Sequence, residues 1–266
     1  MQRLSIVSLM AANALPFYRG VAHYLSRQTG LRVTLIEGLP WHEQEQLLDR
    51  GQAEIGIICG LLYTHKTAWL DLLAAPVMRA VRYQRSPIYF SDIVVQHDSR
   101  FQAFADLRGA RWLYNDRGSF SGYAVLRAHL SALGESGDFC GCIGESGGHL
   151  RSLALIAAGA ADAAAIDSTV LEFELQRRPE LASQIRVVAT IGPHPIPPVV
   201  VAKHMPAELK RRLHAALLRM HEDVQGSEIL ADGLIERFVA VQDCDYNRVR
   251  LTARNAEQVH FHHHRE

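Results

Sequence analysis

The sequence predicts an α/β protein of two lobes, each a mostly parallel sheet flanked by helices, joined by two hinge crossings. Three observations lead to this expectation. Strand and helix patterns alternate along most of the chain, which is typical of α/β sheets with helical crossovers. Two long extended stretches interrupt the alternation, near residues 86–91 and 191–198. The 266 residues suffice for two lobes of ordinary size.

The elements of the first stretch follow from apolar spacing and from glycines that end helices. Residues 54–59 form a continuous apolar run, as expected of a strand covered on both faces. In order, we expect a strand at 4–9, a helix from Phe17 to Gly30, a strand at 31–36, a short helix at 41–50 and the strand at 54–59.

The second stretch continues the alternation after the extended segment 88–96. Ser168 is placed to cap the helix that follows it. Residues 140–148 are expected to form a loop. We expect a short helix at 101–107, a strand at 111–115, a helix at 125–133, a helix at 149–158, a strand at 163–166 and a helix at 169–177.

The last stretch supplies the second crossing and returns to the first lobe. Extended segments at 185–190 and 199–202 flank a proline-rich stretch, and helices are expected from Pro206 to Met220, at 227–234 and at 246–259. The expected lobes are therefore residues 1–90 with 193–266, and residues 91–192. A cleft between lobes is a usual place for a small ligand, and hinge closure is a known motion of such proteins.

Composition excludes several classes of protein. The chain has 28 Lys and Arg residues and 28 Asp and Glu residues. It therefore lacks the excess of basic residues that is typical of nucleic-acid-binding proteins. No apolar run reaches the roughly 18–20 residues that cross a bilayer. The four cysteines complete no zinc site and indicate inert thiols or one incidental bridge. We expect no metal, no cofactor and no catalytic residues.

The most informative segment is Gly118–Tyr123, which lies between an expected strand and an expected helix. The amides of Ser119 to Tyr123 and the serine hydroxyls would present donors and the positive end of the helix dipole to an anion. The plainer interpretation is a serine cap in a tight turn. A nucleophile elbow needs serine at the centre of Gly-x-Ser-x-Gly, but Phe120 occupies that centre here. The segment is not a Walker loop either, because no Gly-Lys-Ser/Thr follows it.

Three more polar side chains lie at the ends of expected elements. Asp167 ends a strand, and His149 opens a helix after two glycines. Tyr63 follows the apolar strand at 54–59. Ligands of open α/β sheets bind outside the carboxyl ends of strands. Each residue also has a purely structural interpretation, as a cap, a surface residue or a packing aromatic.

These residues carry a resemblance to the phosphate/phosphite/phosphonate class of ABC-transporter substrate-binding proteins, which have a type II periplasmic-binding-protein fold. The resemblance covers about residues 3 to 245. Four stretches carry it in the family's order: Gly51–Gly56 with Tyr63, Asp106–Gly109 before Ser119–Tyr123, His149 before Ala158–Ser168, and Pro195–Val201 before the helix at 209–220.

The resemblance implies a two-lobed receptor that closes on a small oxyanion and delivers it to an ABC permease. It also implies a periplasmic or cell-surface location, although residues 1–14 only faintly imitate a signal peptide, which leaves a cytoplasmic location open. We expect a monomer. Carried over by motif, the ligand-binding residues are Tyr63, Ser119, Ser121, Gly122, Tyr123, His149 and Asp167. Phe120, within the same turn, is the eighth candidate.

One residue departs from the family pattern. The central threonine of the family's turn is Phe120 here, which removes a hydroxyl donor and adds a large ring. Losing a hydrogen bond to a charged group costs about 1.5–3 kcal/mol. A solute with an apolar part could recover this by packing on Phe120, Tyr63 or Trp41. The expected solute is thus phosphonate- or phosphate-like, or an organic anion.

Two alternatives from other classes of protein stay open at this stage. Ser121, His149 and Asp167 could form a hydrolase-like set in an intracellular enzyme, or serve a ligand sensor, on the same fold. The chain could also be a regulatory domain that binds a partner and leaves its cleft empty.

Overall fold

The computed structural model describes residues 3–261, which form two compact units. Unit 1 contains residues 3–88 and 195–247, and unit 2 contains residues 89–194 and 248–261. The first two crossings lie within two residues of the expected ones. In the described residues the chain crosses a third time after Asn247, which was not expected.

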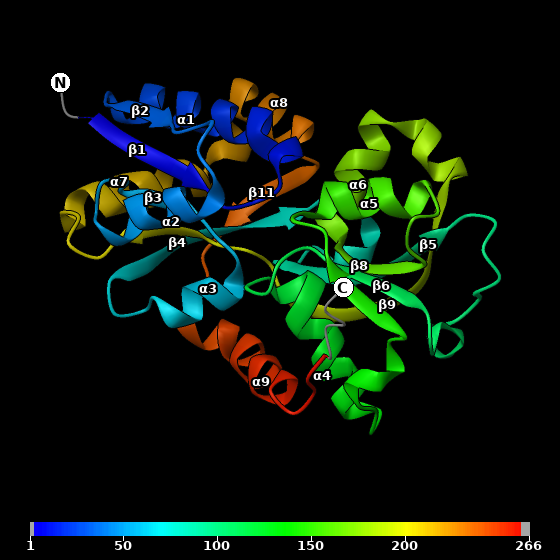
Figure 1. Cartoon of the computed structure of the whole chain (residues 1–266). Coiled ribbons are helices and arrows are strands. Elements are labelled where there is room, and N and C mark those ends of the chain that lie inside the picture. The colour runs from blue at the N-terminus through cyan, green and yellow to red at the C-terminus, as the bar shows by residue number, and fades with distance from the viewer. Residues whose placement is uncertain (1–2, 262–266) are drawn as a thin grey trace. The chain divides into compact units, whose positions relative to one another are not determined.

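Unit 1 contains a six-stranded sheet in the order β11-β4-β10-β3-β1-β2 (Figure 1). β1 pairs in parallel with β2 and β3, whereas β10 runs antiparallel to β3 and β4, and β11 antiparallel to β4. Its strands are β1 (Arg3–Ser8), β2 (Arg32–Leu35), β3 (Ile55–Ile57), β4 (Leu70–Met78), β10 (Val199–Ala202) and β11 (Ile235–Val239).

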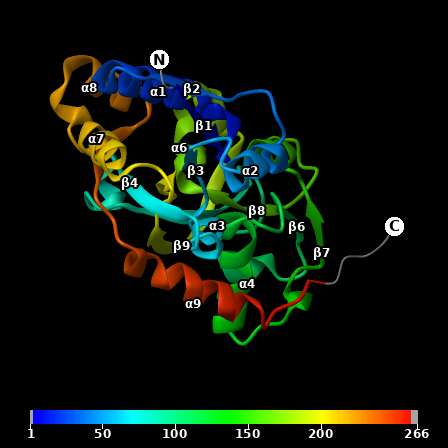
Figure 2. The ribbon, with the colours of Figure 1, turned by 90° about the vertical axis from the view of Figure 1, so that its left-hand side faces the viewer.

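The helices of unit 1 gather mainly as one group. α1, α7 and α8 lie side by side in Figures 1 and 2, and α1 contacts both of the others. α1 begins with Pro16 in its first turn and ends at Gly30, whose φ of 67° is left-handed. The helices are α1 (Leu15–Thr29), α2 (Trp41–Asp49), α3 (Gly60–His65), α7 (Ala207–Leu218) and α8 (Val224–Asp232).

Unit 2 contains a five-stranded sheet in the order β7-β6-β8-β5-β9. β6 pairs in parallel with β7 and β8, while β5 runs antiparallel to β8. Its elements are β5 (Ile88–Gln96), β6 (Arg111–Tyr114), α4 (Val125–Ala132), β7 (Cys142–Glu145), α5 (His149–Ala157), β8 (Ala163–Asp167), α6 (Ser168–Arg177), β9 (Ile185–Pro195) and α9 (Asn247–Ala256).

The predicted α/β fold class is confirmed, but both sheets are mixed rather than mostly parallel. The strands β4 and β11 were not expected, because β4 is rich in Leu and Ala and contains a proline, a composition of low β-propensity. The expected loop at 140–148 contains the edge strand β7, and the expected helix at 101–107 is only a 3₁₀ turn, Phe104–Leu107.

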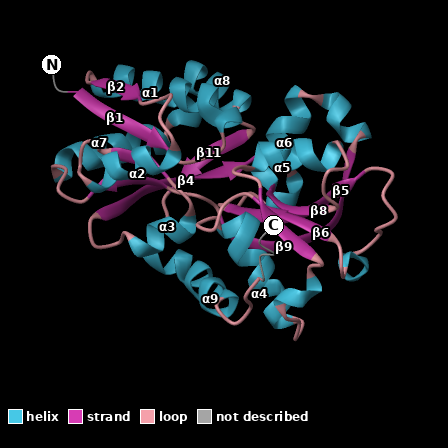
Figure 3. Cartoon of the chain, viewed as in Figure 1, coloured by secondary structure: helices cyan, strands magenta, loops and turns pink. Residues whose placement is uncertain are grey.

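The unit 2 sheet has an apolar core on each of its two faces. Ile93 and Val95 pack with Leu126 of α4, whereas Val94 packs with Leu153 of α5. Successive strand residues point to opposite faces, so β5 serves both cores. Figure 3 shows α5 and α6 on one side of this sheet and α4 on the other. The sheet therefore positions the start of α4 and the start of α5 at fixed places.

Residues 248–261 belong to unit 2 rather than to the lobe of residues 193–266 in which we expected them. The physical reason is burial: Val259 and Phe261 pack into the α4 side of the core. The Arg127 guanidinium also donates to the Val259 carbonyl at 2.6 Å. The rest of the histidine-rich end, residues 262–266, lies outside the described residues.

Replacing Phe261 with Ala should destabilise unit 2, because the change removes a buried ring that contacts Tyr123 at 5.7 Å between centroids. Buried Phe→Ala substitutions cost about 3–5 kcal/mol, so the melting temperature should fall by several degrees. The control is Leu251→Ala on α9, whose side chain is 52% exposed. Equal melting temperatures of the two variants would contradict the assignment of this segment to the core.

Candidate functional site

The serine-containing segment joins β6 to α4 through a π-helical turn, Phe120–Ala124. Ser119 caps this turn, and its Oγ accepts a hydrogen bond from the Gly122 amide at 3.1 Å. The Ala124 amide donates to the Ser119 carbonyl at 3.1 Å. The first amides of a helix have no acceptor within it, so those of Phe120 and Ser121 are available donors at the positive end of the dipole. π-Turns of this kind are frequent at functional sites.

Ser121 and His149 are brought together by the ends of two parallel strands. β6 leads into the serine turn and β7 leads into α5, whose first residue is His149. Ser121 Oγ lies 3.2 Å from His149 Nε2. Both side chains are buried, at 4% and 9% exposure. Burial lowers the pKa of His149 to about 4, so the imidazole is neutral near pH 7 and supplies hydrogen bonds without charge.

Position 122 requires glycine, because Asn115 and His149 approach the backbone there too closely for a side chain. A Cβ at this position would lie 1.9 Å from Asn115 Oδ1 and 3.0 Å from His149 Cε1. Asn115 follows β6 directly and is itself buried. Any side chain at position 122 would therefore displace the residues that surround the serine hydroxyls.

Asp167 caps α6, the role that we had expected of Ser168. Its carboxylate accepts hydrogen bonds from the Thr169 amide at 2.8 Å and the Thr169 hydroxyl at 2.7 Å, while Ser168 Oγ accepts one from the Phe90 amide. Burial raises the pKa of Asp167 to about 6, and the nearby Asp92 acts in the same direction. A carboxyl that titrates near neutrality can share a proton with a ligand.

Phe120 and Tyr123 are packing aromatics of the same turn. The Phe120 ring is fully buried and lies perpendicular to the ring of His194, with 5.1 Å between centroids. Tyr123 packs against Tyr114 at 4.8 Å and belongs to the α4 core. Sequence reasoning missed His194, because a lone histidine between two prolines carries no motif.

Tyr63 belongs to unit 1, whereas the other seven predicted residues belong to unit 2. It lies on α3, where its hydroxyl donates to Asp243 Oδ1 at 2.9 Å and its ring contacts Tyr246. Tyr63 is buried.

Buried polar atoms without a hydrogen-bond partner collect around the serine turn and Asp167. Most of those described in unit 2 lie beside a predicted site residue: His149 is in contact with Ser121, Asn115 faces Gly122, and Ser91 pairs in register with Asp167. Ser99 Oγ is also without a partner in the described chain and lies beside no predicted site residue. Such atoms cost free energy unless something binds them. The others in unit 2 are Ser91 Oγ, Asn115 Oδ1, His149 Nδ1 and both ring nitrogens of His194.

The hydrolase arrangement is not formed. A catalytic histidine needs a carboxylate on its second ring nitrogen, but His149 Nδ1 has no partner within residues 3–261, and Asp167 instead caps α6. No group of three or more metal-ligating side chains occurs among the described residues, and the four cysteines are free. No described helix is long and apolar enough to cross a membrane.

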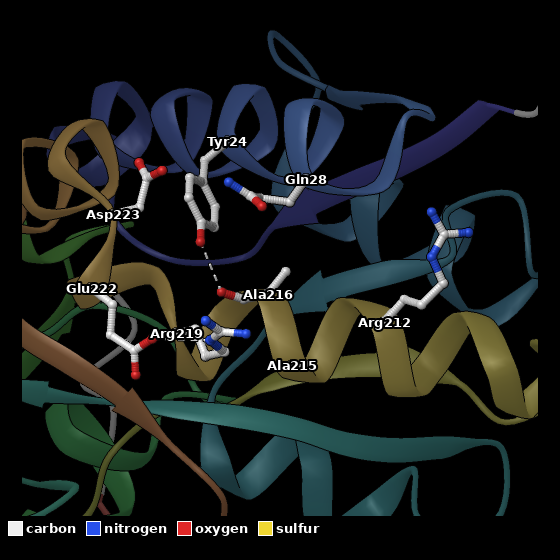
Figure 4. A pocket seen from close by; sticks show the side chains of 8 residues that line it. All are labelled: Tyr24, Gln28, Arg212, Ala215, Ala216, Arg219, Glu222 and Asp223. Atoms are coloured by element: carbon white, nitrogen blue, oxygen red, sulfur yellow. Dashed lines mark hydrogen bonds and ion pairs between the residues drawn. The ribbon is translucent and has the colours of Figure 1, made fainter.

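A separate hollow of about 440 Å³ lies on unit 1, between α1 and α7 (Figure 4). It contains no predicted site residue. Three of its lining residues stand in ion pairs: Arg219 pairs with Glu222, and Asp223 pairs with Arg27. Arg212 donates to the Thr29 carbonyl, and Tyr24 donates its hydroxyl to the Ala216 carbonyl at 3.1 Å.

Substituting Gly122 by Ala should disturb the serine turn, because the new methyl would overlap Asn115 Oδ1. Overpacking of this kind costs about 1–3 kcal/mol. Truncating the obstacle in the double variant Asn115→Ala/Gly122→Ala should recover part of that loss, and a double-mutant cycle of unfolding free energies measures the coupling. Strictly additive effects would contradict the close approach.

The buried histidines and Asp167 should change the unfolding free energy with pH in opposite directions. Because burial lowers the pKa values of His149 and His194 to about 4, protonation of these side chains in the unfolded chain lowers the stability of the fold as pH falls from about 6.5 towards 4. Asp167, with its pKa raised to about 6, contributes stability below its unfolded pKa that is lost as pH rises through 6.

The variant Asp167→Asn keeps a helix-capping side chain but removes the carboxyl. Its melting temperature should rise more steeply between about pH 4 and pH 7 than that of the wild type, whereas His149→Gln should rise less steeply. Thermal melts across this range measure the slopes. If the melting temperatures of the wild type and both variants change equally with pH, the pKa values of Asp167 and His149 are not shifted in the expected directions.

Comparison with known proteins gives one family and many structural neighbours. Residues 10–246 match the model of a family described as the phosphonate periplasmic substrate-binding protein of ABC transporters. A binding protein component of an ABC phosphonate transporter from Pseudomonas aeruginosa superposes with a TM-score of 0.84 at 18% identity, covering 97% of this chain and 87% of that one.

Two further structures show the range of ligands on this fold. A Prochlorococcus marinus protein in complex with methylphosphonate has a TM-score of 0.80 at 17% identity, covering 97% of this chain and 99% of that one. An ancestral arginine-binding protein bound to arginine has a TM-score of 0.60 at 14% identity, covering 87% and 97%. The family match spans most of the chain, and it indicates a binding protein rather than an enzyme. The chain belongs to the family of periplasmic substrate-binding proteins of ABC phosphonate transporters.

Proposed function

We propose that the protein captures a small organophosphonate, and that unit 2 holds the phosphonate group. The amides of Phe120 and Ser121 and the hydroxyls of Ser119 and Ser121 replace the water shell of the anion, and the imidazole of His149 holds the Ser121 hydroxyl in place. These are neutral donors on rigid elements, which is how a helix start binds phosphate-like groups. Gly122 and Tyr123 shape the turn. Tyr63 is a proposed ligand contact on the strength of the family resemblance.

The observation that carries this proposal is the buried Ser121–His149 pair with an unpartnered His149 Nδ1. A structural histidine in a core has partners for both nitrogens. A neutral imidazole has one donor and one acceptor. When His149 Nε2–H donates to Ser121 Oγ, the Ser121 hydroxyl proton remains for an anion oxygen, and Nδ1 can accept from a protonated solute oxygen.

Asp167 would select the protonation state of the solute. An ionised carboxylate repels a dianion, whereas it accepts a hydrogen bond from a protonated phosphonate oxygen. The pKa of Asp167, raised to about 6, lets the residue keep or release the shared proton near neutrality. The arrangement therefore favours a monoanion or a shared proton.

Phe120 indicates a solute with an apolar part. The ring occupies the position of a hydroxyl donor in the related turn, which lowers affinity for a bare phosphate roughly ten- to a hundredfold. Contact of an organic substituent with the ring would offset this loss. The methylphosphonate complex of the Prochlorococcus marinus protein supports a ligand of this class.

Family membership supports the remaining parts of the proposal. The protein would act as a monomer outside the cytoplasmic membrane and deliver its solute to an ABC permease. This role needs tight but reversible binding and no chemistry on the solute.

Replacing Ser121 with Ala should weaken methylphosphonate binding about ten- to a hundredfold, because one hydrogen bond to a charged group is lost. Isothermal titration calorimetry measures the affinity, and circular dichroism checks that the fold is kept. The matched control is Ser183→Ala, an exposed serine of the same unit. If both variants bind methylphosphonate as the wild type does, the anion site is not at the serine turn.

A further inference from the structure

His194 is a buried histidine with no assigned role. It lies at the end of β9, as the last residue of unit 2 before the chain crosses back to unit 1, and only 5% of its surface is exposed. Neither ring nitrogen has a partner among the described residues. The flanking Pro193 and Pro195 have no N–H, so the nearest backbone offers the ring no donor.

The place of His194 connects it to the anion site. Its ring is perpendicular to that of Phe120, with centroids 5.1 Å apart, and it also contacts Tyr89 at 6.3 Å. Phe120 stands between Ser119 and Ser121 in the chain. The imidazole is therefore separated by one aromatic ring from the serine turn.

The chemistry of a buried neutral imidazole suits a polar but uncharged group. Burial lowers the pKa of His194 to about 4, and Arg248 acts in the same direction. A neutral imidazole has one donor and one acceptor. A hydroxyl group can satisfy either one, whereas a phosphonate oxygen without a proton can use only the donor.

We infer that His194 is a further ligand-binding residue, which together with Phe120 forms a subsite for the organic substituent of the solute. Phe120 packs against the carbon chain and His194 hydrogen-bonds a hydroxyl at its end. The solute class is a hydroxyalkylphosphonate. This inference rests on the proposed function, because the phosphonate group must be held by the serine turn for its substituent to reach the subsite.

The test compares two solutes of nearly equal shape, 2-hydroxyethylphosphonate and propylphosphonate, which differ by a hydroxyl in place of a methyl. The variant His194→Phe keeps an aromatic ring beside Phe120 and removes both nitrogens. Calorimetry should show about a tenfold loss of affinity for 2-hydroxyethylphosphonate and less than about a threefold change for propylphosphonate. The control His129→Phe changes another histidine of unit 2 that packs on a phenylalanine ring, and both affinities should stay unchanged.

A ligand-free measurement tests His194 independently. Because His194→Phe removes two buried nitrogens that lack partners, the melting temperature of the protein without solute should rise by about 2–4 °C. A fall would mean that the nitrogens stabilise the fold, and it would overturn the inference. An equal loss for both solutes, or none for either, would overturn it as well.

The two proposals fail in different ways. If the wild type binds both solutes and Ser121→Ala weakens both, while His194→Phe does not discriminate between them, only the subsite is wrong. If the wild type binds neither solute, the proposed function fails and the subsite with it.

Discussion

The contact between Ser121 and His149 depends on the arrangement of the unit 2 sheet. The two residues are 28 positions apart in the sequence, but each follows a strand of the same parallel pair, β6 and β7. Parallel pairing places the carboxyl ends of both strands at one edge of the sheet. A shift of register between β6 and β7 would separate the hydroxyl from the imidazole, so the pairing of these two strands sets the geometry of the proposed site.

The surroundings of this contact show how the protein keeps polar groups available inside a packed unit. Gly122 allows Asn115 and His149 to approach the turn without a side chain between them. Apolar cores on both faces of the sheet hold the starts of α4 and α5 in place. The stability of unit 2 thus comes from packing on the two faces, whereas the unpartnered polar atoms near the carboxyl ends of the strands cost the free protein some stability.

Much of this could be predicted from the sequence, because local patterns carry it. Apolar alternation, helix-ending glycines and the order of strands and helices predicted the fold class, and the serine turn was placed correctly between a strand and a helix. The direction of β10 and β11 depends on long-range pairing, which no local pattern contains. The burial of residues 248–261 in unit 2 was missed for the same reason. His194 could not be found, because its position depends on a ring contact with Phe120, 74 residues away in sequence.

The free cysteines offer a direct way to observe the two units in solution. Cys142 is exposed on unit 2 and Cys244 is exposed on unit 1. Burial raises the pKa of Cys140 to about 12, which keeps that thiol unreactive towards maleimides. Once the half-buried Cys59 of unit 1 is replaced by serine, a donor and an acceptor fluorophore on Cys142 and Cys244 would therefore report changes in the separation of the units in single molecules.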